Sequence, residues 1–374
     1  MHRLDPGLRR DDKQTMQQFQ TDIVIVGAGP VGLFAIFEAG MLKMRAHVVD
    51  SLDIIGGQCA ALYPEKPIYD IPGHPSLLAV ELIEKLKEQA APFKPVYHLG
   101  QKVMKIEKDS GFRIQDSGSK EFSSLNPESR ILNPEWCIET SKGISIHCHA
   151  ILIAAGCGAF GPNRPPLEGV EQYEGKSIFY LVSKREDFRG KKVAIAGGGD
   201  SAVDWAISLS ELTEKLYMIH RRPKFRCAPE SESKLKALAD AGKIEMVVPY
   251  QLARLEGQGG KLSSVVVATL EGQERKLDAD ILLPFFGLAM ELGPIAEWGL
   301  NLLQNHITVN PATMQTSVPG IFAIGDIASY EGKLKLILSG FSEAAMAMHA
   351  AYKLVHPNEA LHFEYSTTSG VPKA

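Results

Sequence analysis

The fold is decided by residues 21–32, which read TDIVIVGAGPVG. The first half of this stretch is a continuous apolar run, which is typical of a buried strand in a parallel sheet. Gly27, Gly29 and Gly32 follow in the spacing G-x-G-x-x-G, and the apolar stretch 33–39 then predicts a helix. In such a unit the first glycine permits a tight turn, the second admits a pyrophosphate, and the third lets the helix pack closely on the strand.

The next predicted strand, residues 46–49, ends at Asp50, which lies 18 residues after Gly32. A carboxylate at this position hydrogen-bonds ribose hydroxyls. The pyrophosphate would lie at the N-terminus of the helix, where unpaired N–H groups and the helix dipole favour an anion. A lone G-x-G-x-x-G also occurs in ordinary glycine-rich turns. Here a strand, the turn, a helix, a second strand and an acid follow one another at the spacing of a dinucleotide-binding unit. The stretch therefore predicts a dinucleotide-binding site.

The second half of the chain repeats this pattern. Residues 192–196 predict a strand, and residues 203–212 and 215–219 predict a helix and the next strand. The turn between them has the spacing G-x-G-x-x-A, and its candidate nucleotide-binding residues are Gly197, Gly199, Asp200, Ser201 and Ala202. A second dinucleotide site is therefore predicted.

The two predicted sites differ where the second strand ends. The first ends in an acid, whereas the second ends in His220, Arg221 and Arg222, with Lys224 and Arg226 close behind. An acid binds a ribose diol and repels a 2′-phosphate, whereas arginines pair with a phosphate. The second site is therefore expected to prefer NADPH over NADH; the alternative is a solvated basic turn.

Length and composition describe an ordinary soluble globular protein. The 374 residues suffice for two domains, and 45% hydrophobic and 22% charged residues are typical of that class. A formal net charge of −4 does not indicate a basic surface for nucleic acid, and no apolar run is long enough for a membrane span. Residues 1–15 lack the apolar segment of a secretory signal and are expected to be a disordered tail, with Met16 as an alternative start. The cysteines show no paired spacing, which suggests a reducing, cytoplasmic setting, and no metal site is predicted.

Three further features lie between the two nucleotide units. Residues 55–72 are rich in glycine, proline and tyrosine and predict a functional loop, with a plain surface excursion as the alternative. Residues 75–91 predict an amphipathic helix. Residues 96–149 alternate apolar and polar positions and predict an antiparallel meander, interrupted by a polar insertion at 116–134.

Residues 150–155 predict another buried strand, and the proline-rich residues 162–166 predict a linker. A further strand is predicted over residues 277–284. Late in the chain, residues 320–327 read GIFAIGDI and place Asp326 after an apolar strand and before a predicted helix. A carboxylate and a helix N-terminus at this point suit a ribityl or phosphate oxygen.

The two nucleotide turns, the late Gly-Asp and the sequence HRRPKF resemble the thioredoxin reductase-like flavoproteins over residues 20–374. In that family the first turn holds FAD, the second holds NADPH, and the late Gly-Asp contacts the ribityl side of the flavin. The resemblance implies an α/β fold with two Rossmann-like nucleotide-binding domains, a β-meander and a C-terminal extension. After the tail 1–15, it implies an FAD-binding domain formed by residues 16–162 and 287–374, and an NADPH-binding domain formed by residues 163–286.

The redox cysteines of related disulfide reductases are missing. Thioredoxin reductases carry C-x-x-C just before the second turn, whereas residues 176–191 contain no cysteine. Enzymes of the glutathione reductase type carry a second cysteine five residues after the first; here Cys59 stands alone and Pro64 occupies that position. Without a dithiol, two-electron transfer to a disulfide lacks its carrier. Cys59 and Cys157 are therefore expected to be small core or loop residues.

What remains closely resembles the type 2 ferredoxin–NADP⁺ reductases. The features are GGQCAALYPEKPIYDIPG at residues 56–73, GAF at 158–160 and GGGDSAVDWA at 197–206. The resemblance implies that Tyr63 stacks on one flavin face and that Tyr365, in the tail, stacks on the other. No catalytic side chain is assigned, and Tyr365 is the candidate gate. The FAD-binding positions implied besides the three glycines are Pro30, Val31, Asp50, Gln58, Tyr63, Val103, Phe160, Asp326, Tyr365 and Thr367.

The reaction that this resemblance implies is hydride transfer from NADPH to flavin N5, followed by single-electron transfers to ferredoxin, or the reverse. The family also implies a homodimer and a tail, residues 361–374, after a final helix predicted over residues 343–354. Two alternatives stay open. One is another NADPH-dependent flavoprotein reductase that uses a quinone, a flavodoxin or an external disulfide protein. The other is a non-enzymatic NADPH-sensing flavoprotein.

Overall fold

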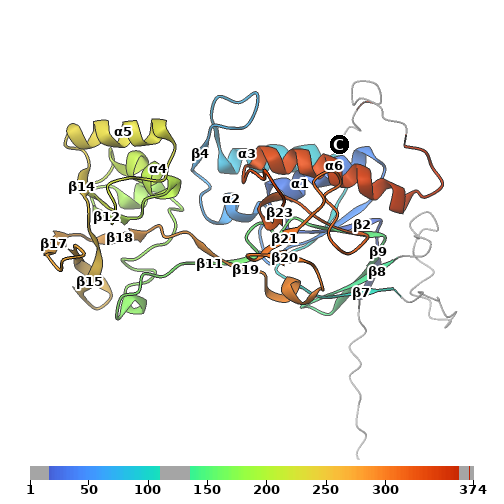
Figure 1. The fold of residues 1–374 in the computed structure, drawn as a ribbon, viewed down its shortest axis with the longest axis horizontal. Helices are drawn as coiled ribbons and strands as arrows, with labels where there is room; N and C mark the ends of the chain where they lie inside the picture. The colour runs from blue at the N-terminus through green and yellow to red at the C-terminus, as the bar shows by residue number, and fades with distance from the viewer. Residues whose placement is uncertain (1–16, 110–134, 362–369, 371–374) are drawn as a thin grey trace, which may run out of the picture. The chain divides into compact units, whose positions relative to one another are not determined.

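The computed structural model describes residues 17–109, 135–361 and 370 (Figure 1). These residues form two compact units. The first unit consists of the described residues within 1–55, 86–156 and 293–374, and the second of those within 56–85 and 157–292. The boundaries predicted for the FAD-binding and NADPH-binding domains follow ligand binding rather than compactness, and they stay a prediction. No helix in the described ranges has the length and apolar character needed to cross a membrane.

A five-stranded parallel sheet forms the centre of the first unit. Its order is β22-β10-β2-β3-β6, and every pairing in it is parallel. The four residues of β2 are all buried, as are those of β3 and β10, because a parallel sheet of this kind is covered on both faces. The strands are β2 (Ile23–Val26), β3 (Ala46–Val49), β6 (Val96–His98), β10 (Ala150–Ile153) and β22 (Ile321–Ala323).

Two helices of the first unit pack against each other, α1 (Pro30–Met41) and α6 (Ile337–Val355) (Figure 1). Gly340 of α6 makes this approach possible, because a Cβ atom there would lie 2.4 Å from Cγ2 of Val31. Both helices are longer than predicted. α1 begins at Pro30, which suits the first turn of a helix because its missing N–H would be unpaired there. The division of the chain into two units falls within a third helix, α3 (Ala79–Ala90), after Lys85.

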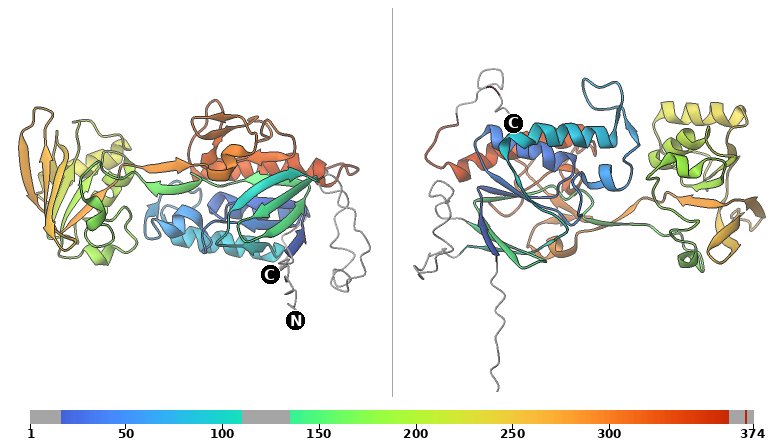
Figure 2. Two further views of the ribbon diagram at one scale, coloured as in Figure 1. Left: turned by 90° about the horizontal axis from the view of Figure 1, so that it is seen from below. Right: turned by 180° about the vertical axis from the view of Figure 1, so that it is seen from behind.

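A second sheet of the first unit has the order β1-β9-β8-β7, and Figure 2 shows these strands side by side. β7, β8 and β9 form an antiparallel meander as predicted, and β1 joins β9 in parallel. The prediction was wrong for β6, which pairs in parallel with β3 in the central sheet. The insertion 116–134 lies outside the described residues. The strands are β1 (Gln17–Gln20), β7 (Val103–Lys108), β8 (Trp136–Thr140) and β9 (Ile144–Cys148).

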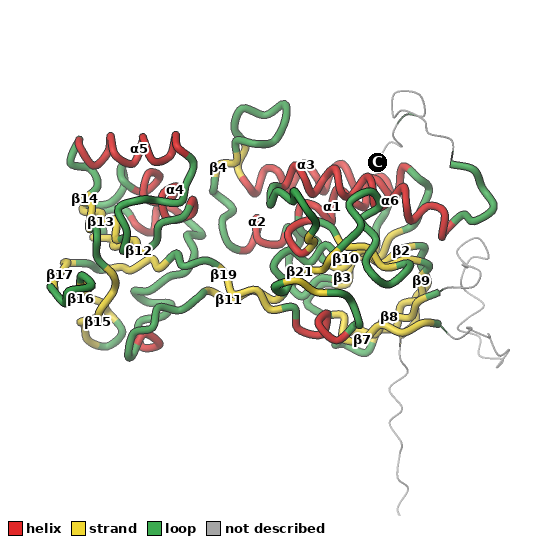
Figure 3. The backbone as a smooth tube through the Cα atoms, viewed as in Figure 1, coloured by secondary structure: helices red, strands yellow, loops and turns green. Residues whose placement is uncertain are grey.

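The second unit repeats the parallel arrangement on a smaller scale. Its sheet has the order β14-β13-β12-β18, with the helices α4 (Asp200–Leu209) and α5 (Pro229–Asp240) in contact with each other (Figure 3). The unit also contains an antiparallel sheet of three strands. The strands are β12 (Lys192–Ala196), β13 (Lys215–Ile219), β14 (Glu245–Val247), β18 (Ile281–Pro284), β15 (Gln251–Gln258), β16 (Lys261–Ala268) and β17 (Glu274–Asp278).

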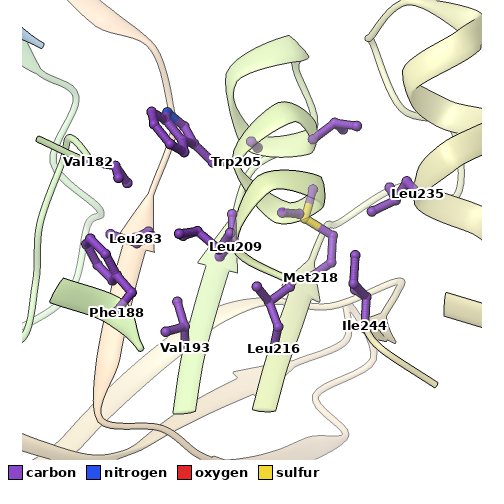
Figure 4. Packing of buried hydrophobic residues seen from close by; sticks show 14 of the residues in the cluster. Val182, Phe188, Val193, Trp205, Leu209, Leu216, Met218, Leu235, Ile244 and Leu283 are labelled. Atoms are coloured by element: carbon purple, nitrogen blue, oxygen red, sulfur yellow. The ribbon is translucent and has the colours of Figure 1, made fainter. Parts of the chain in front are cut away.

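The core between α4 and the parallel strands of the second unit is shown in Figure 4. Trp205 and Leu209 of α4 belong to one buried cluster with Leu216 and Met218 of β13, and Leu235 of α5 joins it. All of these residues except Leu235 come from the predicted helix 203–212 and strand 215–219, whereas α5 was not predicted from the sequence.

The remaining elements are short. Two strands, β11 (Ala159–Pro162) and β19 (Leu288–Glu291), pair in antiparallel, as do β4 (Pro67–Ile68) and β5 (Leu77–Leu78). β20 (Leu302–Leu303), β21 (His306–Thr308) and β23 (Ala328–Ser329) form a small sheet. The 3-10 turns are η1 (Ala91–Phe93), η4 (Val170–Gln172), η5 (Arg185–Phe188), η6 (Gly293–Glu297) and η7 (Gly325–Ile327).

Several sequence predictions need correction at these short elements. The predicted loop 55–72 contains the helix α2 (Gly57–Ala61) and β4. The helix predicted from residue 75 begins at Ala79, because Leu77 and Leu78 pair with β4 instead. The strand predicted over 277–284 is two strands in different sheets, β17 and β18.

Two predicted connections also differ from the structure. The linker predicted from residue 162 follows a strand, β11, that pairs with β19. Asp326 lies within the 3-10 turn η7, and the following α-helix, α6, begins only at Ile337. In both cases the sequence signal was too short to distinguish a brief strand or turn from a loop.

A buried pair of histidines lies between two strands of the central sheet. Nδ1 of His47 in β3 lies 3.0 Å from Nε2 of His98 in β6, and Phe19 packs edge-on against both rings. Burial, together with the neighbouring His98 and Arg45, lowers the pKa of His47 to about 4. Burial also lowers the pKa of His98. Both rings are therefore neutral at pH 7.

We predict that this pair makes the first unit sensitive to acid. The pKa of His47 lies below its ordinary value of 6.5, so between pH 6.5 and 4 the unfolded chain binds more protons than the folded chain. The contribution of His47 to the free energy of unfolding is therefore retained above pH 6.5. The free energy of unfolding falls by about 2 kcal/mol between pH 7 and pH 5. Urea unfolding at both pH values measures the loss, which His47→Gln should reduce. His74→Gln is the control, and an unchanged loss in His47→Gln would contradict the prediction.

Candidate functional site

The first glycine turn packs backbone directly against backbone. Gly27 has a φ of +114°, and a Cβ atom there would lie 2.4 Å from the carbonyl oxygen of Ala154. A Cβ atom at Gly32 would lie 2.0 Å from the carbonyl oxygen of Gly27. A Cβ atom at Gly29 would meet no heavy atom within 4 Å. The N-terminus of α1 therefore borders open space at Gly29, which fits the approach of a phosphate group.

Asp50 is fixed beside this turn. Its Oδ2 accepts a hydrogen bond from the N–H of Ala28 at 2.6 Å, and its Oδ1 accepts one from the N–H of Leu52 at 2.8 Å. Burial raises the pKa of Asp50, and the two backbone hydrogen bonds act in the opposite direction. A carboxylate has about four acceptor sites, so both oxygens can accept further hydrogen bonds from ribose hydroxyls.

The turn that carries Asp326 is held by a residue that the sequence analysis missed. Glu343 of α6 is buried, and its Oε2 accepts a hydrogen bond from the N–H of Gly325 at 2.7 Å. Its Oε1 accepts one from the Tyr330 hydroxyl at 2.7 Å and contacts the ammonium group of Lys333. Burial, together with Glu343, raises the pKa of Tyr330 to about 12. This buried ion pair therefore fixes η7 against α6.

A weak sequence signal for Glu343 existed. It is the one acidic residue of α6, and it lies at helical spacing from Gly340 and Ala347, which are both buried. A carboxylate on the apolar face of a helix needs a partner, because an unpaired buried charge is very costly. The sequence alone did not identify Lys333 as that partner.

In the second unit the glycine turn is fastened to the segment after β13. A Cβ atom at Gly198 would lie within 2.1 Å of the His220 ring, so that ring covers the turn. The N–H of Arg226 donates to the carbonyl oxygen of Gly198 at 2.6 Å. Asp200, the first residue of α4, accepts a hydrogen bond from the N–H of Ala228 at 3.0 Å through Oδ1. These contacts hold the basic segment beside the N-terminus of α4.

Four cations project from this segment into solvent. Arg221, Arg222, Lys224 and Arg226 are exposed, and none of them pairs with a carboxylate of the described residues. Burial lowers the pKa of His220, and the neighbouring arginines lower it further. The imidazole is therefore neutral at pH 7, and its ring lies 4.9 Å from that of Phe225. The arrangement is able to bind a phosphate group near the N-terminus of α4.

The other predicted cofactor-binding residues are placed less closely together. Gln58 lies on α2, and Tyr63 follows that helix, with its hydroxyl 4.0 Å from the Cys59 sulfur. Tyr63 packs against the apolar cluster of the second unit. Val103 is buried at the start of β7. Phe160 belongs to β11 by its backbone, and Tyr365 and Thr367 lie outside the described residues.

The cysteines and the potential metal-ligating side chains of the described residues form neither a disulfide nor a metal site. None of the five cysteines is in a disulfide, and Cys59 and Cys148 are buried. Burial raises the pKa of Cys148 and of Cys227, which disfavours the thiolate. Within residues 17–109 and 135–361, no three His, Cys, Asp or Glu side chains are grouped so that they could hold a metal ion.

Comparison with known proteins gives a consistent result. Residues 21–353 match the family described as pyridine nucleotide-disulphide oxidoreductase. A ferredoxin–NADP reductase of Paramagnetospirillum magneticum is 62% identical, over 96% of this chain and 100% of its own length. The ferredoxin–NADP reductase of Rhodospirillum rubrum is 58% identical, over 94% of this chain and 97% of its own.

The fold is similar to those of solved thioredoxin reductases. The crystal structure of the enzyme from T. acidophilum superimposes with a TM-score of 0.74 at 25% identity, covering 89% of this chain and 98% of its own. The thioredoxin reductase of Lactococcus lactis gives a TM-score of 0.74 at 23% identity, covering 90% of this chain and 99% of its own. The predicted thioredoxin reductase-like fold is confirmed.

We predict that substitutions at Gly29 and Gly32 separate ligand binding from folding. Gly29 has a φ of −72°, which alanine adopts freely, so Gly29→Ala should leave the stability of the ligand-free chain within about 0.5 kcal/mol of the parent. It should weaken dinucleotide binding, because the added methyl group would face the phosphate. Gly32→Ala should instead destabilise the ligand-free chain, because its Cβ would overlap the Gly27 carbonyl.

Urea unfolding of the ligand-free variants and titration with FAD measure the two effects separately. The control is Gly199→Ala in the second unit, because Gly199 has a φ of −98°, which alanine also adopts. Gly73→Ala is unsuitable as a control, because the φ of +81° at Gly73 would strain an alanine. Unchanged FAD affinity in Gly29→Ala would show that no phosphate lies against that residue.

Proposed function

Because the chain belongs to the ferredoxin–NADP reductase family of the pyridine nucleotide-disulphide oxidoreductases, we propose that it is an FAD-dependent ferredoxin–NADP⁺ reductase. The observation that carries this proposal is the 62% identity, end to end, with a ferredoxin–NADP reductase. The cysteine pattern supports it, because residues 176–191 contain no cysteine and position 64, five residues after Cys59, is a proline. The chain thus lacks the dithiol that carries electrons to a disulfide.

In this proposal the domain formed by residues 16–162 and 287–374 binds FAD. The N-terminus of α1 binds the pyrophosphate, and Asp50 accepts hydrogen bonds from the adenosine ribose. Asp326, on the turn held by Glu343, faces the ribityl side. When bound, FAD supplies the redox chemistry by taking a hydride at N5 and releasing electrons one at a time. The proposed FAD-binding residues are Gly27, Gly29, Pro30, Val31, Gly32, Asp50, Gln58, Tyr63, Val103, Phe160, Asp326, Tyr365 and Thr367.

The second unit binds NADPH. The N-terminus of α4 binds the pyrophosphate, and the exposed arginines after β13 bind the 2′-phosphate. The neutral ring of His220 packs over the turn at Gly198, so it holds the segment in place without adding charge. The proposed NADPH-binding residues are Gly197, Gly199, Asp200, Ser201, Ala202, His220, Arg221 and Arg222.

Further parts of the proposal rest on the family rather than on the described residues. Tyr63 and Tyr365 stack on the two flavin faces, and Tyr365 gives way when the nicotinamide approaches. The protein acts in the cytoplasm as a homodimer, with ferredoxin as its partner. The domains that bind FAD and NADPH are residues 16–162 with 287–374, and residues 163–286.

The function is tested by the electron acceptor. We expect NADPH to reduce cytochrome c rapidly only when ferredoxin is added, because ferredoxin relays single electrons. Steady-state assays with and without ferredoxin measure this, and flavin released by denaturation should be FAD. Equal rates without ferredoxin, and faster turnover with a quinone or a disulfide protein, would favour another flavoprotein reductase. Absence of turnover with every acceptor would favour an NADPH sensor.

We predict that Arg221 and Arg222 set the preference for NADPH. Loss of a charge-assisted pair to phosphate costs about 1.5–3 kcal/mol, which is roughly tenfold to over a hundredfold in affinity. The double variant Arg221→Ala, Arg222→Ala should therefore raise the KM for NADPH and leave that for NADH nearly unchanged. Steady-state kinetics with both nucleotides measure this. Lys243→Ala, an exposed cation elsewhere in the unit, is the control. Equal effects on both nucleotides would indicate a solvated basic turn.

A further inference from the structure

Residues 333–338, KLKLIL, which we call the strap, present leucines to solvent just before and within the first turn of α6. Leu334 is 62% exposed, Leu336 is 39% exposed and Leu338 is 42% exposed. Lys335, between Leu334 and Leu336, is exposed as well, so residues 334–336 all reach solvent. Folding alone would favour burial of the leucines, and here they are exposed.

Both lysines of the strap also make contacts within the chain. Lys333 pairs with Glu343, and its side chain is buried. Lys335 reaches His306 of β21, with Nζ 2.8 Å from Nε2. Lys333 and Lys335 therefore attach the strap to α6 and β21. This arrangement leaves the leucines available for contacts outside the chain.

Two more exposed leucines adjoin the strap. β20 consists of Leu302 and Leu303, which are 39% and 56% exposed, and Leu303 pairs with His306. β20 and β21 form a sheet with β23 (Figure 1). Because Lys335 contacts His306, the strap and this hairpin are neighbours. We call Leu302, Leu303, Leu334, Leu336 and Leu338 the leucine patch; an exposed apolar cluster with a polar rim is typical of an interaction site.

The patch carries an uncompensated positive charge. Nδ1 of His306 lies 2.8 Å from the carbonyl oxygen of Gln304, so this nitrogen carries the proton and donates it. Nε2 is then the acceptor for the ammonium group of Lys335. Lys335 has no carboxylate partner among the described residues, whereas Lys333 is neutralised by Glu343. A carboxylate of another molecule would complement Lys335.

The patch is tied to the turn proposed for the flavin. Glu343 contacts both the N–H of Gly325, next to Asp326, and the ammonium group of Lys333 in the strap. One buried side chain thus fixes both the Asp326 turn and the strap. A molecule bound at the leucine patch would lie close to that turn.

We propose that the leucine patch is the docking surface for the electron-carrier protein, an acidic one-electron carrier of the ferredoxin type. The proposal rests on the function proposed above. The leucines would pack against apolar side chains of the carrier, and Lys335 would pair with one of its carboxylates. Weak electron-transfer complexes use small interfaces of this kind. A second copy of the chain fits less well, because the patch offers no carboxylate to Lys335 in a symmetric contact.

Leu334→Gln and Lys335→Gln test the apolar and the charged part separately. Neither residue is among those proposed to bind FAD or NADPH. Leu270→Gln is the matched control, since Leu270 is 85% exposed between β16 and β17 of the second unit. Two purified ferredoxins, one [2Fe–2S] and one [4Fe–4S], serve as docking acceptors. Ferricyanide serves as a small acceptor that needs no docking surface.

We expect Leu334→Gln to lower kcat/KM for ferredoxin about tenfold, through a higher KM. Lys335→Gln should lower it about fivefold at low salt and flatten its dependence on ionic strength. The NADPH–ferricyanide rate and the sedimentation coefficient should be unchanged in both variants. Leu270→Gln should behave as the parent with every acceptor.

Three results would overturn the proposal. Unchanged kinetics with ferredoxin in both variants would show that the carrier docks elsewhere. Dissociation of an oligomer in Leu334→Gln would show that the patch contacts a second copy. If the parent chain reduces ferricyanide but neither ferredoxin, the proposed function fails together with the docking surface, whereas the first two results leave that function intact.

Discussion

Contact of backbone with backbone at glycine is the constraint on which both nucleotide sites depend. Gly32 lies against the carbonyl of Gly27, and Gly27 lies against that of Ala154, at distances that exclude any side chain. In the second unit a Cβ atom at Gly197 would lie 2.7 Å from the carbonyl oxygen of Phe285. This packing directs a helix N-terminus toward the end of a parallel sheet. An anion-binding position follows in each unit.

The two sites use one backbone design with opposite charges. In the first, Asp50 is buried and holds the turn through the N–H of Ala28. In the second, an acid in another place, Asp200, holds the segment that carries Arg221 and Arg222. Those arginines remain exposed and without carboxylate partners among the described residues. The charge at the end of the second strand therefore distinguishes the two sites, and the proposed preference for a ribose diol or a 2′-phosphate rests on it.

Glu343 connects the first site to the surface. A buried ion pair is weak evidence for stability, because the cost of removing two charges from water offsets much of their attraction. Its effect here is geometric, since the carboxylate holds Gly325 and Lys333 at once. The Asp326 turn and the strap are consequently fixed to the same point of α6. The turn proposed to contact the flavin and the proposed docking surface are therefore linked through one side chain.

The sequence by itself determined the local units. The strands 46–49, 192–196 and 215–219 were predicted with their observed bounds, because short continuous apolar runs next to glycine turns have few other structures. Tertiary structure alone decided which strands pair. β6 joined the parallel sheet rather than the meander, because register and partner depend on contacts that no local pattern encodes. It also decided the role of Glu343, because a buried charge is recognisable only when its partner, ten residues earlier in the chain, folds against it.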